Sequence, residues 1–444
     1  MARYISIIQI NSENDMAINF ESVNCNRQQH LSRRSLLKST LVTTSGMVVA
    51  NWGALFHSQT IAAQAKQTGK RCIMLYMEGG ASQIDTFDMK PGRPTAGPFR
   101  PIKTNVNGIE ICEYLPKMAQ HADKLAIIRS MKTKSVDHGI GGYHMHTCYP
   151  SSERFPHAEI GAMIAKYCEN SNNDLPSFIK MGSPGCTAGS GYLGPQYEPF
   201  TLDTDGKLPS FANPSVPQEV QDRRGELLKF MEDQHAKNHF ARPFSSHREA
   251  ELRTVRLMRA RKTFDVANDW GKARERYGNS PFGHGCFTAL KLVEAGVPFV
   301  EIGQDGYDSH NDNFPVHKAN MGVLDPAWSS LLQDLQDRGL LQDTLVVWTS
   351  EFGRTPAINA QAGRDHFGRA WTIVLAGGGI KGGQHYGSSN RDGFEVEDKP
   401  VDEGSYFATI YKALGINPRA KHYLGVRPIW ATPEGSKPIQ ELIG

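Results

Sequence analysis

Short runs of consecutive apolar residues recur along the chain and alternate with longer stretches of helical periodicity. Runs of this length that are apolar at nearly every position predict strands of a sheet covered on both faces. The runs occupy residues 71–77, 124–129, 297–302, 344–349 and 371–377.

Amphipathic patterns between these runs predict helices over residues 157–168, 284–296 and 324–339, the second of which ends on a glycine typical of a helix C-cap. Alternating strands and helices indicate a mostly parallel sheet in a three-layer α/β/α sandwich. Residues 216–277 are charged, helix-prone and free of strand-like runs. We interpret them as a helical insertion into one domain, residues 66–444.

The N-terminal region reads as a twin-arginine signal peptide. SRRSLLK at residues 32–38 precedes an uncharged stretch at 41–56 and small residues at 63–65. This order predicts export through the twin-arginine machinery, cleavage near Ala65 and a periplasmic or extracellular mature protein. The uncharged stretch is too short and too polar for a stable membrane span. Because this route carries folded proteins, it favours a chain that binds a metal or cofactor before export.

Composition narrows the range of ligands. The net charge of +3 is too small, and the arginines too scattered, for a nucleic-acid-binding surface. No C-x-x-C pair occurs, which disfavours a zinc ribbon or a dense disulfide framework, although one or two disulfides of unassigned pairing stay open. Six cysteines follow the signal peptide: Cys72, Cys112, Cys148, Cys168, Cys186 and Cys286.

Acidic residues and histidines follow the predicted strands. Ligands of a doubly wound sheet bind beyond the carboxyl ends of its strands. Carboxylate and imidazole groups converging there would bind a divalent metal such as Zn, Mn, Ca or Fe. The candidate metal ligands are Glu78, Asp85, Asp308, His310, Glu351, Asp365 and His366, and the candidate catalytic arginines are Arg354 and Arg364.

Each of these groups also has a structural interpretation. Asp85 and Asp88 are residue types that cap the segment following a glycine turn. Asp308 and His310 fit a solvated turn. The pair at 365–366 fits an ion pair neutralised by a nearby arginine. A shared position at the mouth of one sheet favours the metal site, because buried carboxylates must be paired or metal-bound.

A second group of histidines lies in DHGIGGYHMHTCYP, residues 137–150. It contains His138, His144 and His146, with glycines at 139, 141 and 142. The glycines predict a mobile loop that brings a histidine toward the site. His138 and His144 are therefore candidate catalytic residues.

Several segments together resemble an exported bacterial family called domain of unknown function 1501. The matching segments are residues 79–92, 97–131, 306–314, 351–371 and 375–387. That family is similar in turn to the alkaline phosphatase and sulfatase superfamily. The resemblance implies an alkaline-phosphatase-like α/β/α sandwich and metal-dependent hydrolysis of phosphate or sulfate esters.

The superfamily's first metal-binding acid would fall on Glu78 or, in the same loop, Asp85. Its later acid and histidine would fall on Asp308 with either His310 or Asp312.

Its Asp-His pair would fall on Glu351 and Phe352, a departure because phenylalanine cannot bind a metal. Its last histidine would match His366, assisted by Asp365. The resemblance thus implies at most one tightly bound metal, or a second held weakly with help from His138 or His144.

The sulfatase C/S-x-P-x-R motif is missing from the chain, which disfavours a formylglycine sulfatase. The superfamily's nucleophile position would fall on Asp137 and His138, with Thr133 and Ser135 as nearby hydroxyls. We expect an exported metal-dependent hydrolase of anionic small-molecule or saccharide esters, in which Arg354 or Arg364 stabilises developing charge. The alternative is a non-catalytic envelope binding protein derived from a hydrolase.

Overall fold

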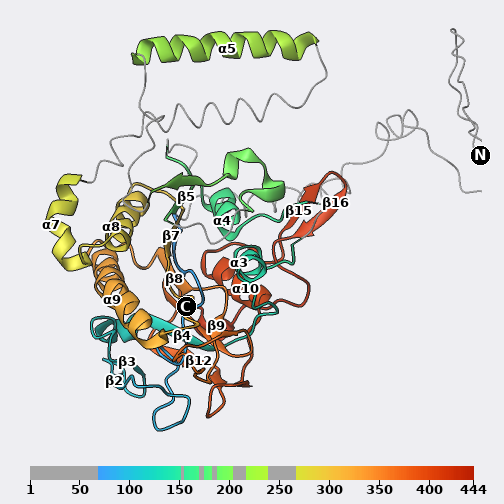
Figure 1. Cartoon of the computed structure of the whole chain (residues 1–444). Coiled ribbons are helices and arrows are strands. Elements are labelled where there is room, and N and C mark those ends of the chain that lie inside the picture. The colour runs from blue at the N-terminus through green and yellow to red at the C-terminus, as the bar shows by residue number, and fades with distance from the viewer. Residues whose placement is uncertain (1–68, 152–154, 170–174, 183–187, 204–216, 239–266) are drawn as a thin grey trace, which may run out of the picture. The chain divides into compact units, whose positions relative to one another are not determined.

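The computed structural model describes residues 69–151, 155–169, 175–182, 188–203, 217–238 and 267–444 (Figure 1). The expected signal peptide and Cys186 lie outside these residues, as does part of the expected helical insertion.

A mostly parallel sheet forms the centre of the described chain. Every neighbouring pair of strands is parallel except the two that involve β11, which runs antiparallel to β4 and β8. The pairing of β1 with β8 aligns Cys72 with Leu345. In sheet order the strands are β12 (Gln384–Tyr386), β4 (Leu125–Met131), β11 (Trp371–Gly377), β8 (Thr344–Thr349), β1 (Arg71–Met77), β7 (Phe299–Gln304), β5 (Phe178–Met181) and β6 (Phe200–Leu202).

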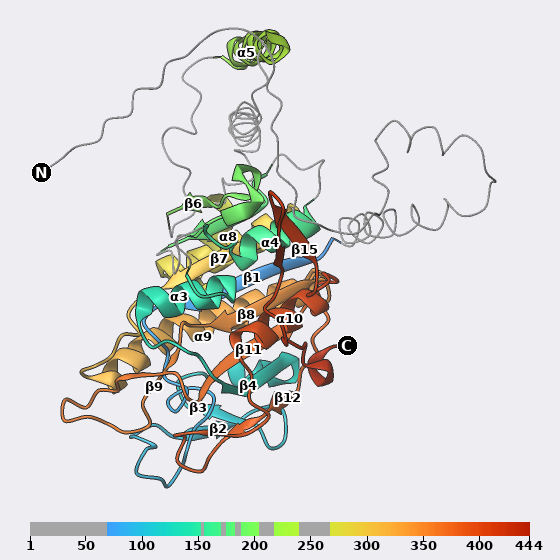
Figure 2. The same ribbon diagram turned by 90° about the vertical axis from the view of Figure 1, so that its right-hand side faces the viewer.

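Helices cover both faces of this sheet, as Figures 1 and 2 show. Alternate side chains of β1 enter two separate cores: Ile73 and Leu75 pack on one side, Cys72 and Met74 on the other. The first core includes α7 (Ala267–Tyr277), α8 (Pro281–Glu294) and α9 (Asn313–Asp337). The second includes α3 (His138–Thr147), α4 (Ile160–Cys168) and α10 (Glu403–Ala413). The predicted three-layer α/β/α sandwich is confirmed.

The remaining elements complete the described fold. α5 (Gln218–Asn238) and α7 lie in the stretch expected to be helical. The small strands are β2 (Pro101–Lys103), β3 (Glu110–Cys112), β9 (Gly353–Arg354), β10 (His366–Phe367), β13 (Ser388–Ser389), β14 (Val396–Asp398), β15 (Lys421–Leu424) and β16 (Arg427–Trp430). The 3₁₀ helices are η1 (Met118–Lys124), η2 (Gly191–Leu193), η3 (Pro195–Tyr197) and η6 (Gln440–Leu442).

Most of the glycine-rich segment 137–150 forms the helix α3 (His138–Thr147), so the prediction of a loop is wrong. The Asp137 side chain caps α3 by accepting a hydrogen bond from the peptide N–H of Ile140. A side chain at Gly141 would press against Phe352 and Glu351. The glycine therefore lets the helix pack closely on the segment after β8, and this tertiary contact outweighs the low helix propensity of glycine.

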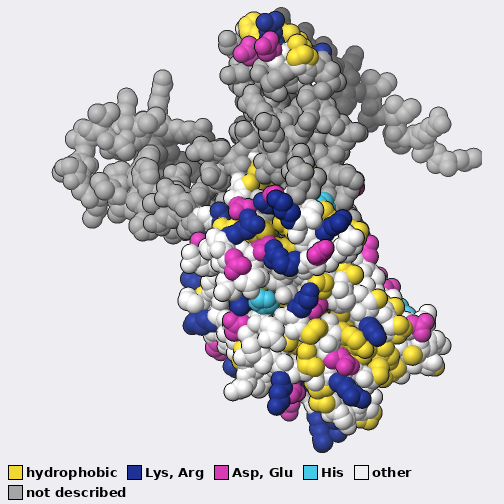
Figure 3. Space-filling view, turned by 90° about the vertical axis from the view of Figure 1, so that its left-hand side faces the viewer, with side chains coloured by type: hydrophobic (Ala, Val, Ile, Leu, Met, Phe, Trp, Pro, Cys, Tyr) yellow, Lys and Arg dark blue, Asp and Glu magenta, His cyan; other side chains and the backbone are white. Residues whose placement is uncertain are grey.

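The described surface is mixed in charge. Figure 3 shows basic and acidic side chains interspersed on the face formed by α7, α8 and α9. Ion pairs there join Lys291 to Asp269 and Arg338 to Glu294. No helix within the described ranges is long and apolar enough to cross a membrane. The five cysteines in those ranges are buried and free, so they form no disulfide with one another.

Candidate metal centre

The sheet topology brings three loops to one edge. β7 and β8 run parallel to β1, so the carboxyl ends of all three strands lie together. β11 runs antiparallel to β8, so its beginning lies at that same edge. The whole connection between β8 and β11 therefore stays beside the loops that follow β1 and β7. Within it, β9 and β10 pair and place His366 opposite Arg354.

Glycines allow these loops to approach closely. Gly79 has a φ of +106°, and a Cβ there would collide with the backbone of Asp308. A Cβ at Gly363 would collide with the backbone carbonyl of His310. Any larger residue at either position would push apart the loops after β1, β7 and β8.

Three imidazoles are oriented in the same way. The Nδ1 atoms of His138, His310 and His366 lie 2.6, 2.7 and 2.7 Å from Glu351 Oε1, Asp365 Oδ1 and the carbonyl oxygen of Val136. Carboxylate and carbonyl oxygens only accept hydrogen bonds, so each Nδ1 donates. In the neutral rings each Nε2 therefore carries a lone pair. Histidine ligands of metals are held in this way.

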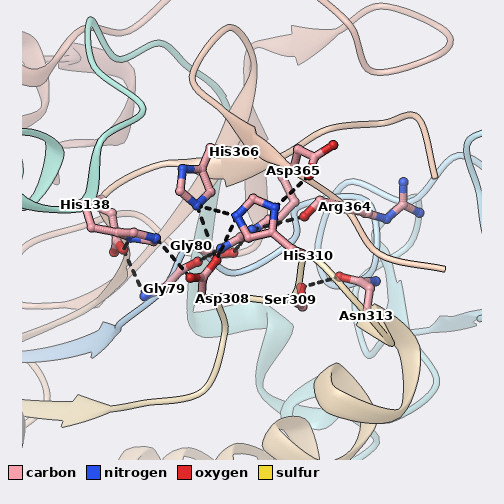
Figure 4. A network of polar contacts seen from close by, with 12 residues as sticks. Gly79, Gly80, His138, Asp308, Ser309, His310, Asn313, Arg364, Asp365 and His366 are labelled. Carbon is pink, nitrogen blue, oxygen red and sulfur yellow. Dashed lines mark hydrogen bonds and ion pairs between the residues drawn. The ribbon is translucent and has the colours of Figure 1, made fainter. Parts of the chain in front are cut away.

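The three Nε2 atoms converge on the Asp308 carboxylate (Figure 4). Those of His310 and His366 each lie 3.3 Å from Asp308 Oδ1, and that of His138 lies 3.4 Å from Asp308 Oδ2. Ligand atoms of His138, Asp308 and His366 all lie within 4.8 Å of one another. His138 Nε2 is buried and has no hydrogen-bond partner among the residues described.

The closest pair of nitrogens indicates a cation site. His310 Nε2 and His366 Nε2 are only 3.0 Å apart. Both Nδ1 protons are already donated elsewhere, so two neutral rings would point lone pairs at each other. That contact is favourable only with a proton or a metal cation between the two atoms. Borderline divalent ions bind this donor set of imidazole and carboxylate.

The Arg354 side chain holds the Asp308 carboxylate in place. Its guanidinium is fully buried and donates to Asp308 Oδ1 at 2.6 Å, to Gly80 O at 3.0 Å and to Arg364 O at 3.0 Å, as well as to Gly79 O. Burial alone would raise the pKa of Asp308, but the hydrogen bond and charge of Arg354 lower it to about 2. Asp308 is therefore a carboxylate throughout the physiological range.

Charges around the cluster do not balance. Asp308, Glu351 and Asp365 contribute three negative charges and Arg354 one positive charge, which leaves two negative charges when the imidazoles are neutral. A single divalent cation would neutralise them.

The hydrogen bond to Glu351 raises the pKa of His138 despite its partial burial, while burial lowers the pKa of His366.

The apolar ring of Phe352 packs against two of the imidazoles. Its ring is fully buried, with its centroid 5.0 Å from that of His138 and 4.7 Å from that of His366. At the position where the resemblance implies a histidine, this side chain supplies packing and no ligand.

The model of the family described as protein of unknown function (DUF1501) matches residues 69–443. The chain belongs to this family. No curated protein matches the chain.

Solved structures similar to this DUF1501 chain share little sequence with it. The PsFucS1 sulfatase from Pseudoalteromonas sp. is 13% identical, with a TM-score of 0.37 over 81% of this chain and 72% of that one. The lipoteichoic acid synthase LtaP from Listeria monocytogenes is 10% identical, with a TM-score of 0.36 over 82% and 75%. An alkaline phosphatase superfamily protein from Vibrio parahaemolyticus is 9% identical, with a TM-score of 0.32 over 81% and 75%.

The residues nominated from the sequence separate into three groups. One group lies in the cluster: ligand atoms of Asp308, His366 and His138, the last nominated as a catalytic residue, are mutually close, and His310 adjoins Asp308 and His366. A second group holds the cluster from outside: Glu351, Asp365 and Arg354.

The third group lies elsewhere. Asp85 and Arg364 bind each other in a buried ion pair. The charged groups that act on His144 are Glu403 and Lys134, and burial lowers the pKa of its imidazole. Glu78, whose peptide group bonds the loop after β7, is absent from the set of converging ligand atoms.

One buried polar network was missed entirely. Lys180 Nζ lies 2.6 Å from Glu159 Oε2 and 3.7 Å from Glu301 Oε1, and His146 Nε2 lies 3.3 Å from the same Glu301 oxygen. All four side chains are almost fully buried. The available signal was a charged residue inside an otherwise apolar strand, as in FVEIGQ and FIKM. The network ties the last turn of α3 to β5, β7 and the start of α4.

Proposed function

We propose that this chain is an exported, metal-dependent hydrolase-like protein that acts on phosphate or sulfate esters without formylglycine. The observation that supports this most directly is the convergence of three Nε2 atoms on Asp308, each ring held through its Nδ1 atom. This donor set and the two surplus negative charges fit one divalent ion.

The nitrogen-rich donor set favours Zn, Mn or Fe over Ca, which prefers oxygen ligands. His138, Asp308 and His366 would hold the ion, and His310 Nε2 lies beside them, 3.0 Å from His366 Nε2. A bound ion of this kind supplies Lewis-acid polarisation of an ester oxygen.

The protein's own residues orient these ligands. Arg354 holds Asp308 in place, and Glu351 and Asp365 hold His138 and His310. The guanidinium groups of Arg354 and Arg364 are both fully buried. All five N–H groups of Arg364 donate to Asp85 or to backbone carbonyls. We therefore assign Arg354 a positioning role and Arg364 a structural one, in place of substrate contact.

One observation favours the alternative of a non-catalytic binding protein. The two hydroxyl candidates beside α3 make local contacts: Thr133 Oγ1 donates to the carbonyl of Ser135, and Ser135 Oγ accepts from the peptide N–H of Asp137. Neither hydroxyl is among the hydrogen-bond partners of Asp308 or the three imidazoles in the described ranges. Turnover on esters separates the two functions.

The deciding experiment combines metal analysis with an ester panel. Protein purified after export should contain one divalent metal per chain, and Asp308→Ala and His366→Ala should abolish it. His144→Ala, a histidine change outside the cluster, is the matched control and should keep the metal. Hydrolysis of phosphate or sulfate esters that follows metal content supports the hydrolase; stoichiometric metal with no turnover supports the binding protein. Two tightly bound metals per chain, or retention of metal by Asp308→Ala, would contradict the proposed site.

Export is a separate part of the proposal. Its support is the SRRSLLK sequence followed by the uncharged stretch and small residues. Changing Arg33 and Arg34 together to lysine should stop export and processing near Ala65. Normal processing of that double variant would contradict the twin-arginine route.

A further inference from the structure

A two-stranded hairpin near the C-terminus projects from the side of the sheet that α3, α4 and α10 cover (Figure 1). Its strands, β15 and β16, pair antiparallel and are joined by the two residues Gly425 and Val426. Gly425 has a φ of +62°, which suits the first position of a tight hairpin turn. His422 and Ile429 lie opposite each other on the inner face and are buried. The hairpin is therefore anchored by one face, and its tip and outer face are free.

The tip and outer face are apolar and aromatic. Tyr423, Leu424 and Val426 are 64%, 42% and 97% exposed. Trp430, paired with Lys421 across the hairpin, has two cations close to its ring: the Arg419 guanidinium is 4.5 Å and the Lys421 ammonium 4.3 Å from the ring centroid. Such exposure of large apolar side chains on a short projecting turn is unfavourable in water unless the tip is covered in use.

Three cations in and beside the hairpin lack acidic partners. Arg419, Lys421 and Arg427 are exposed, and each stacks on an aromatic ring. Among the described residues none of the three forms an ion pair with a carboxylate. A second copy of the chain would bring the same cations together, and like charges across an interface are unfavourable. The surface therefore fits an anionic partner with an apolar interior.

We propose that this hairpin docks the protein on the surface of an anionic lipid bilayer. Tyr423, Leu424 and Val426 enter the boundary between headgroups and acyl chains, and Trp430 lies at headgroup level, where amphipathic aromatic rings are favoured. Lys421 and Arg427 bind lipid phosphates. The catalytic properties of the metal centre play no part in this argument, so the two proposals fail independently.

The test is sedimentation with vesicles of phosphatidylglycerol mixed with phosphatidylcholine, compared with phosphatidylcholine alone. The protein used is the mature chain from Lys66, which keeps the compact unit and removes the apolar signal segment. We expect binding to anionic vesicles only. Lys421→Glu combined with Arg427→Glu should weaken the binding by at least about thirtyfold, and Leu424→Ser combined with Val426→Ser by about tenfold.

Control variants make the same kinds of change, charge reversal and loss of an exposed apolar side chain, elsewhere on the surface. Lys103→Glu with Lys412→Glu repeats the charge change at two other exposed lysines, and Phe394→Ser removes an apolar side chain that is 39% exposed. Both should bind like the unaltered protein. Equal losses in the control and hairpin variants would overturn the assignment to the hairpin. Loss on charge reversal alone, with the serine variant unaffected, would overturn insertion of the tip.

The same variants distinguish a lipid bilayer from a second copy of the chain as the partner of the hairpin. If the protein fails to bind anionic vesicles, the proposal is wrong. Concentration-dependent dimerisation in sedimentation velocity that Val426→Ser abolishes would then assign the hairpin to a second copy of the chain.

Discussion

Two groups of charged residues lie at the same edge of the sheet, and they differ in whether their interactions are complete. The Asp85–Arg364 pair is fully buried: both carboxylate oxygens accept from the guanidinium, and Ser82 and Asn313 supply further donors. The cluster around Asp308 keeps two surplus negative charges and three imidazole nitrogens without protons to donate. The first group is balanced as it stands, whereas the second is balanced only by added protons on its imidazoles or by a metal cation.

The comparison shows that a carboxylate beside an arginine at a strand end has no fixed meaning. Asp85 and Asp308 each bind a buried arginine. Asp308 differs because imidazoles face its remaining oxygen positions and because its side chain is 48% exposed. The surroundings of the pair, and the access of solvent ions to it, separate a structural ion pair from a ligand site.

The largest effect is expected from disrupting the buried Asp85–Arg364 ion pair. Asp85→Ala should lower the free energy of unfolding by about 3–5 kcal/mol, because it leaves the Arg364 charge buried without a partner. The folded fraction should still bind one metal. Urea denaturation with metal analysis of the folded protein measures both quantities.

Arg364→Lys serves as the control for charge, and it should be destabilising as well because lysine cannot replace the five directed donors. Loss of metal from correctly folded Asp85→Ala would show that the two groups act as one site.

The carboxylates behind the imidazoles give the next largest effect. Glu351→Gln should weaken metal binding by about a hundredfold and Asp365→Asn by about tenfold, the range for loss of an outer hydrogen-bond partner. The difference follows from burial, because the side chain of Glu351 is 2% exposed and that of Asp365 is 54% exposed. Competition with a chromophoric zinc chelator measures both affinities. Asp312→Asn, an exposed change in the loop after His310, should have no effect; the reverse order of the two main variants would contradict the role of burial.

The sheet was predictable because its strands are buried on both faces. Continuous apolar runs identified β1, β8 and β11 to the residue. Parallel strands then gather polar residues at one edge, which is why Asp308 and His366 were nominated together. The antiparallel direction of β11 kept the segment before it at that edge.

The contents of the site were less predictable, because they depend on tertiary contacts. Two aspartates and two arginines at one edge allow either pairing, and sequence does not choose between Asp85 and Asp308 as the partner of Arg364. The glycines at 139, 141 and 142 favour a loop locally, but packing on Phe352 forms α3. His138 is therefore held by a helix terminus and takes part in the cluster from there.

Two buried histidines should respond to pH with opposite sign. Burial disfavours the charged form of His146, but the Glu301 carboxylate outweighs burial and raises its pKa. Its contribution to stability is then complete below about pH 6.5 and is lost as pH rises through the folded pKa. Burial lowers the pKa of His317 to about 4, so its contribution is complete above about pH 6.5 and is lost as pH falls toward 4.

Urea denaturation across pH tests this pair through His146→Gln and His317→Gln. The stability advantage of the unaltered protein over His146→Gln should shrink by about 1.5 kcal/mol above neutral pH, the low end for a charged hydrogen bond. Its advantage over His317→Gln should shrink in acid instead. Parallel pH profiles for the two variants would contradict the assigned charge states.

The smallest effect compares two helix caps of the same kind. Asp137 caps α3 by accepting from Ile140 N at 2.9 Å, and Asp402 caps α10 by accepting from Ser405 N at 2.8 Å. Each change to alanine should cost about 1 kcal/mol of unfolding free energy. Only α3 begins with a residue of the proposed metal site, His138, so only Asp137→Ala should also weaken metal binding, by a few-fold. Thermal denaturation and zinc titration of the two variants measure both effects. If Asp402→Ala weakens zinc binding equally, the loss reflects general destabilisation, and the start of α3 does not position His138.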